Sequence, residues 1–371
     1  MTTQVLIVGA GPVGLTMAAE LARYGVSVRI VDKAAQRTDK SKALVVWSRT
    51  LELLERGAST TPFIDAGLKA TAANIIAGNK LIGHVDVTGV KSKYPYALML
   101  AQNETERLLE AHLSSFAVQV ERGVEVISFS NNKESVSTVL RHQDGREETI
   151  ETGWLIGCDG AHSVVRHAEG LSFLGETMKS DWMLADVHLK GFPFPHSEMA
   201  TYWHKDGVLI VFPFLEAGRY RVVADLGPSD AGPASEVTLD RVQKVIDERG
   251  PGGLTATDPV WLSAFRINER KVADYQSGRV FVAGDAAHVH SPAGGQGMNT
   301  GMQDAFNLAW KLALVCSGRC SEQLLKSYSP ERSEVGEQVL KSAGRLTKVG
   351  TLRNPVAQTL RNHAVQFLIG S

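Results

Sequence analysis

The chain has 371 residues, of which 43% are hydrophobic and 21% charged, a composition typical of a globular protein that can bury a large core. Its 39 basic and 40 acidic residues leave a formal net charge of −1, so neither nucleic acid nor an anionic membrane is expected as a partner. No run approaches the ~20 apolar residues of a membrane-spanning helix. Cys158, Cys316 and Cys320 match no zinc-binding spacing, and no signal-peptide pattern begins the chain, so we expect a reducing, cytoplasmic setting.

The N-terminal region predicts one βαβ unit. An apolar strand at 4–8, a helix at 15–24 and a second strand at 26–31 follow one another, with a glycine-rich turn at 9–14. Because parallel strands joined by a helix need a right-handed crossover, the turn lies at the carboxyl edge of the sheet, where ligands bind in such folds.

The turn contains the residues that a dinucleotide needs. Gly9 permits the tight turn, Gly11 lets the backbone approach a pyrophosphate, and Gly14 lets helix and strand pack closely. Asp32 stands at the end of the second strand, where a carboxylate can accept the ribose hydroxyls of an adenosine. This pattern fits NAD and FAD alike.

The rest of the chain predicts a mixed α/β fold with a discontinuous nucleotide domain. The expected strands are 124–129, 135–141, 154–158, 184–190, 199–204, 208–214, 220–225 and 279–283, and the expected helices are 50–55, 104–116, 303–315 and 332–368, with a long loop from 284 through 301. We assign 1–180 and 265–330 to the nucleotide domain, 181–264 to an antiparallel-sheet substrate domain to which 70–100 can contribute, and 331–371 to a C-terminal helical segment.

Three sequence runs carry a resemblance to a known family. They are GRVFVAGDAAH at 278–288, continued by SPAGGQGMNTG at 291–301 and QDAFNL at 303–308; DGAHSVVR at 159–166; and QNETE at 102–106. The runs resemble the signatures of the para-hydroxybenzoate hydroxylase-like (class A, single-component) FAD-dependent aromatic monooxygenases, over nearly the whole chain. The resemblance implies a Rossmann-like, GR2-type FAD-binding domain with an inserted, mostly antiparallel β-sheet substrate domain and C-terminal helices.

The resemblance also implies a chemistry. FAD is bound non-covalently, NAD(P)H docks transiently as electron donor, and a flavin C4a-hydroperoxide hydroxylates a phenolic or polyketide-like aromatic substrate. The expected partners are a small aromatic molecule and dioxygen, and the expected assembly is a monomer or a homodimer. Two other functions stay open: a flavin oxidoreductase acting on a lipid or isoprenoid, and a non-catalytic protein that binds flavin and an aromatic ligand.

Residues in these runs are expected to bind FAD. Asp285, at a strand end, can accept a ribityl hydroxyl, and the backbone of 295–299 can aim N–H groups at the flavin pyrimidine oxygen. Pro292 has a fixed φ and can hold a carbonyl beside the flavin, near the peroxide site, or simply stiffen the loop. The full expected set is Gly9, Gly11, Gly14, Asp32, Lys33, Lys42, Arg49, Gln102, Val126, Asp159, Asp285, Pro292, Gly295, Gly297, Met298 and Asn299. The protein's acid or base stays unknown.

The chain departs from the family pattern in two ways. Lys42 stands where relatives commonly have an Arg facing the pyrophosphate, and Lys supplies a point charge instead of a bidentate fork. Arg49 can share that role or be a solvated residue at a helix start. The second departure is length: many relatives continue into a C-terminal thioredoxin-like domain, so either this chain is trimmed or the protein is a short member.

Other residues have weaker claims. His288 and His290 have no third ligand at a useful spacing, so no metal site is expected. The candidate substrate-pocket residues are Trp47, Tyr202, His204, Phe212 and Phe265, with ordinary core packing as the alternative for each. Strand alternation puts Tyr202 and His204 on one face and Trp203 on the other. The lack of an evident cationic cluster favours a neutral phenol or polyketide-like aromatic over a carboxylate.

Overall fold

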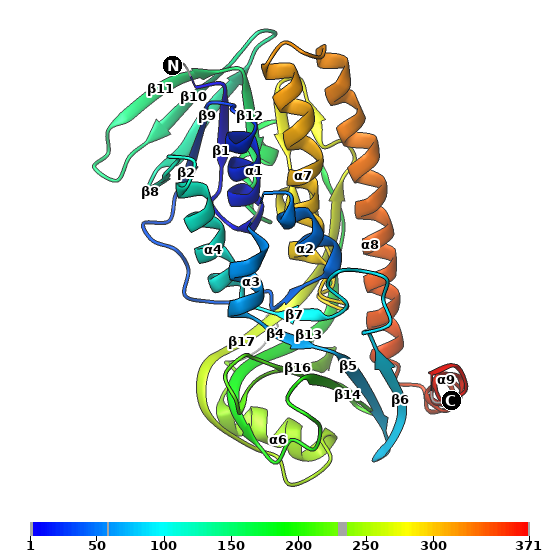
Figure 1. Ribbon diagram of the computed structural model, residues 1–371. Helices are drawn as coiled ribbons and strands as arrows, with labels where there is room; N and C mark the ends of the chain where they lie inside the picture. Colours follow the sequence, from blue (N-terminus) through cyan, green and yellow to red (C-terminus); the bar gives the residue numbers. More distant parts are fainter. Residues whose placement is uncertain (1–2, 58, 229–235, 370–371) are drawn as a thin grey trace.

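The computed structural model describes residues 3–57, 59–228 and 236–369. Figure 1 shows one sheet system with helices around it in the upper part of the molecule and a second, broader sheet below, while the long helices α7 (Gly297–Cys316) and α8 (Tyr328–Gly350) run side by side along one flank.

The upper sheet has six strands in the order β18-β19-β12-β1-β2-β8. These strands are β18 (Gln276–Ser277), β19 (Val280–Val282), β12 (Trp154–Gly157), β1 (Val5–Val8), β2 (Val28–Asp32) and β8 (Val120–Arg122), and all pairs except β18–β19 are parallel. Helix α1 (Pro12–Arg23) connects β1 to β2, which confirms the predicted βαβ unit. Leu6, Ile7 and Ile30 are fully buried and form part of its core.

Helix α7 corrects the loop predicted through 301. The helix begins at Gly297, not at residue 303. Within its first turns, Gly301 packs closely against Val13 and Gly284, which leaves no room for a side chain. A Cβ on Gly301 would lie 2.6 Å from Val13 Cγ2 and 3.0 Å from Gly284 Cα. A glycine-rich run that looks like a loop in the sequence is therefore the first turn of a long helix.

Smaller elements surround the upper sheet. A three-stranded antiparallel sheet contains β9 (Glu125–Asn131), β10 (Val136–Arg141) and β11 (Glu147–Thr152), and another contains β3 (Val45–Val46), β7 (Ala97–Met99) and β4 (Leu68–Ala70). The remaining helices of this part are α2 (Ser48–Glu55), α3 (Thr60–Ala66), α4 (Gln102–Ser114) and α5 (Val164–Ala168), with the 3-10 turns η1 (Gly284–Ala286) and η2 (Glu322–Ser327).

The lower sheet has eight strands in the order β20-β17-β13-β16-β15-β14-β5-β6. They are β20 (His288–Val289), β17 (Thr255–Val272), β13 (Phe173–Lys190), β16 (Arg219–Pro228), β15 (Gly207–Pro213), β14 (Glu198–His204), β5 (Ala72–Ala77) and β6 (Lys80–Asp86). Only β14–β5 pairs in parallel, so the sheet is mostly antiparallel. One face is covered by α6 (Leu239–Arg249), whose Val242 and Ile246 share a buried cluster with the sheet.

Strands β13 and β17 run past the predicted domain boundaries at 180/181 and 264/265. They are paired over most of their length, and their register shifts between Thr177 and Asp181 and again between Asp186 and His188. Beyond these irregularities, the end of β17 pairs with β20, which lies next to the second glycine loop.

The C-terminal stretch predicted as one helical segment is two helices, α8 and α9 (Pro355–Ile369). They are separated at 351–354, directly before Pro355, which lacks the N–H that a continuing helix would use. In Figure 1, α9 lies beside β6 at the lower end of the molecule. Among the described residues, none of the helices is long and apolar enough to cross a bilayer.

Candidate flavin and substrate site

The first glycine turn is shaped by contacts that only glycine allows. Gly9 has φ +98°, and a Cβ on Gly14 would lie 1.9 Å from the Gly9 carbonyl oxygen. At Gly11, by contrast, a Cβ would meet no described atom within 4 Å. Gly9 and Gly14 therefore build the turn, while Gly11 leaves open space at the N-terminus of α1, where helix N–H groups attract phosphate.

Asp32 is fixed beside this turn by the backbone. Its Oδ2 accepts a hydrogen bond from Ala10 N at 2.7 Å and its Oδ1 accepts one from Ala34 N at 2.8 Å. Lys33 next to it is exposed. Val126, on β9, is only 6% exposed and packs inside the hydrophobic core, so the structure does not present its side chain to a cofactor.

The second glycine loop places Asp285 opposite Lys42. Dense protein surroundings raise the pKa of the Asp285 carboxyl, while His288, His290 and Lys42 act in the opposite direction, although the side chain is still reachable by solvent. Lys42 is exposed, so the two opposite charges flank a surface that an anionic, hydroxyl-rich chain can contact.

The segment containing Lys42 is held from two sides. Gln102 Oε1 accepts from Ala43 N at 3.1 Å, and Gln102 N donates to Ser41 Oγ at 2.8 Å. From the lower sheet, the Arg221 guanidinium donates to the backbone oxygens of Ser41 and Lys42.

Arg221 itself is buried with Asp186. Its Nε and Nη2 lie 2.8 Å from the two oxygens of that carboxylate. Sequence reasoning missed this pair, although two charged residues within apolar strands were a signal.

Asn299 joins the two loops that face the expected flavin pyrimidine. It is completely buried, its Oδ1 accepts from Trp47 N at 2.9 Å, and its Nδ2 donates to Val45 O and Gly295 O. Its side chain thus acts as a bridge within the protein, while Gly297 and Met298 form the first turn of α7. Pro292 is exposed, and its carbonyl accepts from Gly295 N at 2.9 Å, which supports the loop-stiffening interpretation.

Asp304 anchors the second loop from below. This fully buried carboxylate accepts from Gly284 N at 3.0 Å, and it pairs with His288 Nε2 at 2.7 Å and with Arg332 Nε at 2.6 Å. Burial alone would raise the pKa of Asp304, but His288 and Arg332 outweigh it and lower the pKa. His288 therefore helps Asp304 to hold the second glycine loop in place. Across the described residues, no group of three or more His, Cys, Asp or Glu side chains could hold a metal.

Asp159 and Arg166 brace the neighbouring turn. Asp159 Oδ2 accepts from Val164 N at 2.7 Å, and burial raises the pKa of this carboxyl. Arg166, a buried cation that sequence reasoning left without a role, donates to Ala286 O at 3.1 Å and stacks over Phe173. It thereby fixes the residue next to Asp285.

Arg49 belongs to the segment that contains Trp47. It stands in the first turn of α2, exposed, and pairs with Glu52 at 3.1 Å, as the helix-start interpretation predicts. With Trp47 and Gln296 it lines a small cavity of about 300 Å³.

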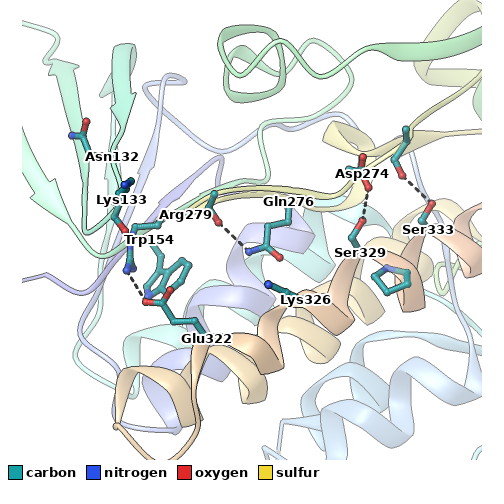
Figure 2. A pocket seen from close by; sticks show the side chains of 13 residues that line it. Asn132, Lys133, Trp154, Asp274, Gln276, Arg279, Glu322, Lys326, Ser329 and Ser333 are labelled. Carbon is teal, nitrogen blue, oxygen red and sulfur yellow. Dashed lines mark hydrogen bonds and ion pairs between the residues drawn. The ribbon is translucent and has the colours of Figure 1, made fainter.

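A larger cavity of about 590 Å³ lies elsewhere (Figure 2). Trp154 and Arg279, which line it, stand at the amino ends of β12 and β19, so the cavity is at the opposite edge of the sheet from the glycine turn. Arg279 is already engaged, with Glu322 at 2.6 Å and over the Trp154 ring at 4.4 Å.

The expected substrate residues separate onto two faces of the lower sheet. Phe212 and Phe265 lie on the face opposite α6, and Phe212 also packs in a cluster with Val45 and Trp47. The prediction that Tyr202 lines the substrate pocket is corrected, because its side chain is buried in the α6 cluster and faces away from Trp47. His204 is two residues further along the same strand, so its side chain is on the same face of the sheet as that of Tyr202. It is Trp203 that joins the Phe212 and Phe265 cluster.

A parallel sheet with a glycine turn, a fixed acidic residue and a second glycine loop at one edge defines a dinucleotide-binding protein. The open space at Gly11, the exposed Asp285 and Lys42, and the helix starts of α1 and α7 fit FAD, whose pyrophosphate and ribityl chain need such groups.

The chain belongs to the FAD binding domain family, whose model matches residues 2–343, and within it to the aromatic monooxygenases similar to para-hydroxybenzoate hydroxylase. It is 41% identical over 368 residues to 6-methylpretetramide 4-monooxygenase of Streptomyces rimosus, covering 98% of this chain and 65% of that protein. It is 36% identical over 351 residues to an uncharacterized aromatic compound monooxygenase, YhjG, of Bacillus subtilis, covering 94% and 69%.

Among solved structures, the anhydrotetracycline hydroxylase OxyS from Streptomyces rimosus aligns with a TM-score of 0.81 at 29% identity, over 99% of this chain and 73% of that one. The chain thus spans about two thirds of the length of the relatives it matches. Because the chain belongs to the FAD binding domain family, its cofactor is FAD.

Proposed function

We propose that the protein uses FAD, NAD(P)H and dioxygen to hydroxylate a polycyclic, phenolic or polyketide-like aromatic compound. The observation that carries the proposal is the half-buried aromatic face of the lower sheet, which continues through Phe212 to Trp47 and Val45 at the flavin loops. The relatives' names, which specify oxygenation of 6-methylpretetramide and anhydrotetracycline, support the same substrate class.

FAD when bound supplies hydride acceptance and dioxygen activation. The chain's own residues do the rest. The glycine turn and Asp32 hold the adenosine end, Asp285 and Lys42 the ribityl and pyrophosphate part, and the α7 start presents backbone N–H groups to the pyrimidine. The aromatic face orients the substrate ring and excludes water.

Two further proposals concern organisation and setting. The upper sheet system serves the nucleotide and the lower sheet the substrate, close to the division at 1–180, 265–330 and 181–264. A cytoplasmic monomer or homodimer is the working assembly, in keeping with three unpaired cysteines.

The test is turnover by FAD-loaded protein with NADPH or NADH and ¹⁸O₂. Anhydrotetracycline and 1,8-dihydroxyanthraquinone serve as polycyclic probes and 4-nitrophenol as a single-ring probe. We expect substrate-stimulated NAD(P)H oxidation and one ¹⁸O atom in a polycyclic product. NAD(P)H oxidation without an oxygenated product would favour a flavin oxidoreductase, and binding without flavin reduction would favour a non-catalytic binding protein.

A further inference from the structure

The face of the lower sheet that looks toward the flavin loops consists of cross-strand rows. One row contains Phe212, Arg221, Asp186 and Trp261, which are paired in that order. It is fixed to the nucleotide part by the hydrogen bonds from Arg221 to Ser41 and Lys42.

A second row lies on the same face. It contains Asp225, Trp182 and Phe265, again paired in that order. Trp182 is four residues before Asp186 on β13, so at about 3.3 Å per residue the two rows are roughly 13 Å apart. The face is therefore long enough for several fused rings.

Trp182 is unusual among the residues of this face. It is 4% exposed, its ring stacks on Phe265 with centroids 6.4 Å apart, and it packs with Leu184 and Val223. Its indole Nε1 is buried and, within the described residues, has no hydrogen-bond partner. An indole N–H can only donate, and leaving such a donor buried and unpaired costs about 1–3 kcal/mol.

The neighbouring acceptor does not serve it. Asp225, the cross-strand partner of Trp182, accepts hydrogen bonds from Ser180, from Gly227 N and from Arg353 Nη2. A phenylalanine at 182 would fill the same apolar cluster without an unpaired donor, whereas an acceptor brought by a ligand would satisfy the indole N–H.

The second row is also covered. Arg353, in the connection between α8 and α9, reaches Asp225 at 3.0 Å, and Arg361 of α9 lies 4.0 Å from the centre of the Trp203 ring. A hydrogen bond made under this cover is shielded from water, which strengthens it.

We propose that the Trp182 indole N–H donates a hydrogen bond to a carbonyl or phenolic oxygen of a polycyclic substrate that extends from the Phe212 row to the Trp182 row. The inference rests on the proposed function. A single phenol ring held beside Phe212 is too short to reach the Trp182 row as well, whereas several fused rings span both rows. Phe265 and Met178, which are half-buried and pack against this cluster, are the side chains that would move to admit the substrate oxygen. Trp182 thus selects substrates by length and by the presence of a distal oxygen.

The test compares Trp182→Phe with the wild type, using calorimetric titration of the FAD-loaded proteins with anhydrotetracycline, 1,8-dihydroxyanthraquinone and 4-nitrophenol. Trp310→Phe, the same change at an exposed position on α7, is the matched control. We expect Trp182→Phe to weaken binding of a polycyclic probe about tenfold, with KM rising and kcat little changed, and to leave 4-nitrophenol binding as it is. Thermal melting checks that both variants are folded.

Equal affinity of Trp182→Phe and wild type for the polycyclic probes would overturn the assignment, as expected if a bound water takes the N–H. In that case, continued oxygenation of a polycyclic probe by the wild type would leave the proposed function standing. If the wild type binds neither polycyclic probe, both the assignment and the polycyclic part of the proposed function fail.

Discussion

Replacing Asp186 by asparagine tests how the lower sheet supports the candidate flavin site. Asp186 and Arg221 are 8% and 3% exposed at their side chains, and two bonds of 2.8 Å join them. The other donors of Arg221 hold the Ser41 and Lys42 carbonyls. Asp186→Asn keeps the side-chain volume but turns an amide NH₂ toward the guanidinium and leaves its charge buried and uncompensated.

Removing one partner of a buried ion pair costs about 3–5 kcal/mol. We expect the variant to unfold at a clearly lower denaturant concentration than wild type. Because the anchor of the Lys42 segment loosens, we also expect FAD affinity to fall about tenfold, which corresponds to ~1.4 kcal/mol. Urea unfolding monitored by circular dichroism and fluorescence titration with FAD measure the two effects separately.

Glu147→Gln is the matched control, because its pair with Arg141 is 48% and 54% exposed at the side chains and such pairs contribute at most about 1 kcal/mol. If Asp186→Asn unfolds at the same urea concentration as wild type, the charge compensation is refuted. If stability falls but FAD affinity does not, the link from Arg221 to the flavin segment is wrong.

Four other changes have clear expectations. Gly14→Ala should prevent folding, because its Cβ would lie 1.9 Å from a backbone oxygen, whereas Gly11→Ala should fold with an unchanged melting temperature and retain less FAD; equal flavin content in Gly11→Ala and wild type would contradict the pyrophosphate assignment. Asp285→Ala should sharply weaken FAD retention, and a fully loaded yellow variant would refute its role. Burial raises the pKa of Tyr202 from 10.0 to about 12, so the folded chain holds this proton more tightly than the unfolded chain and stability falls as pH rises through that interval. Tyr202→Phe, which removes a hydroxyl without a partner among the described residues, should not lower stability at pH 7 and should reduce the loss between pH 10 and 12 in melting experiments.

Local sequence signals were sufficient where structure depends on local geometry. The first glycine turn follows from residues a few positions apart, and β14 begins within one residue of the predicted 199–204 strand. The start of α7 was missed because glycine is needed there for contacts with residues that are far away in the sequence. Gly301 packs against Val13 and Gly284, and no local sequence pattern predicts that contact.

The two faces of the lower sheet show a second limit. Alternation correctly separated Tyr202 from Trp203, but it contains no information about which face is covered by α6 and which looks toward the flavin. That choice is made by α6, which buries Val242 and Ile246 against one side only.

The pair Asp186–Arg221 shows why a site of this kind needs the whole fold. Its members are 35 residues apart and meet only through the register of β13 and β16. The carbonyls that Arg221 holds are 180 and 179 positions away in the sequence. Since burying this charge is unfavourable unless all its partners are present, the lower sheet and the Ser41–Lys42 segment are stable together in one relative position. A change in the sheet's aromatic wall is therefore expected to alter substrate choice while the flavin side keeps its geometry, as long as the Arg221 row remains intact.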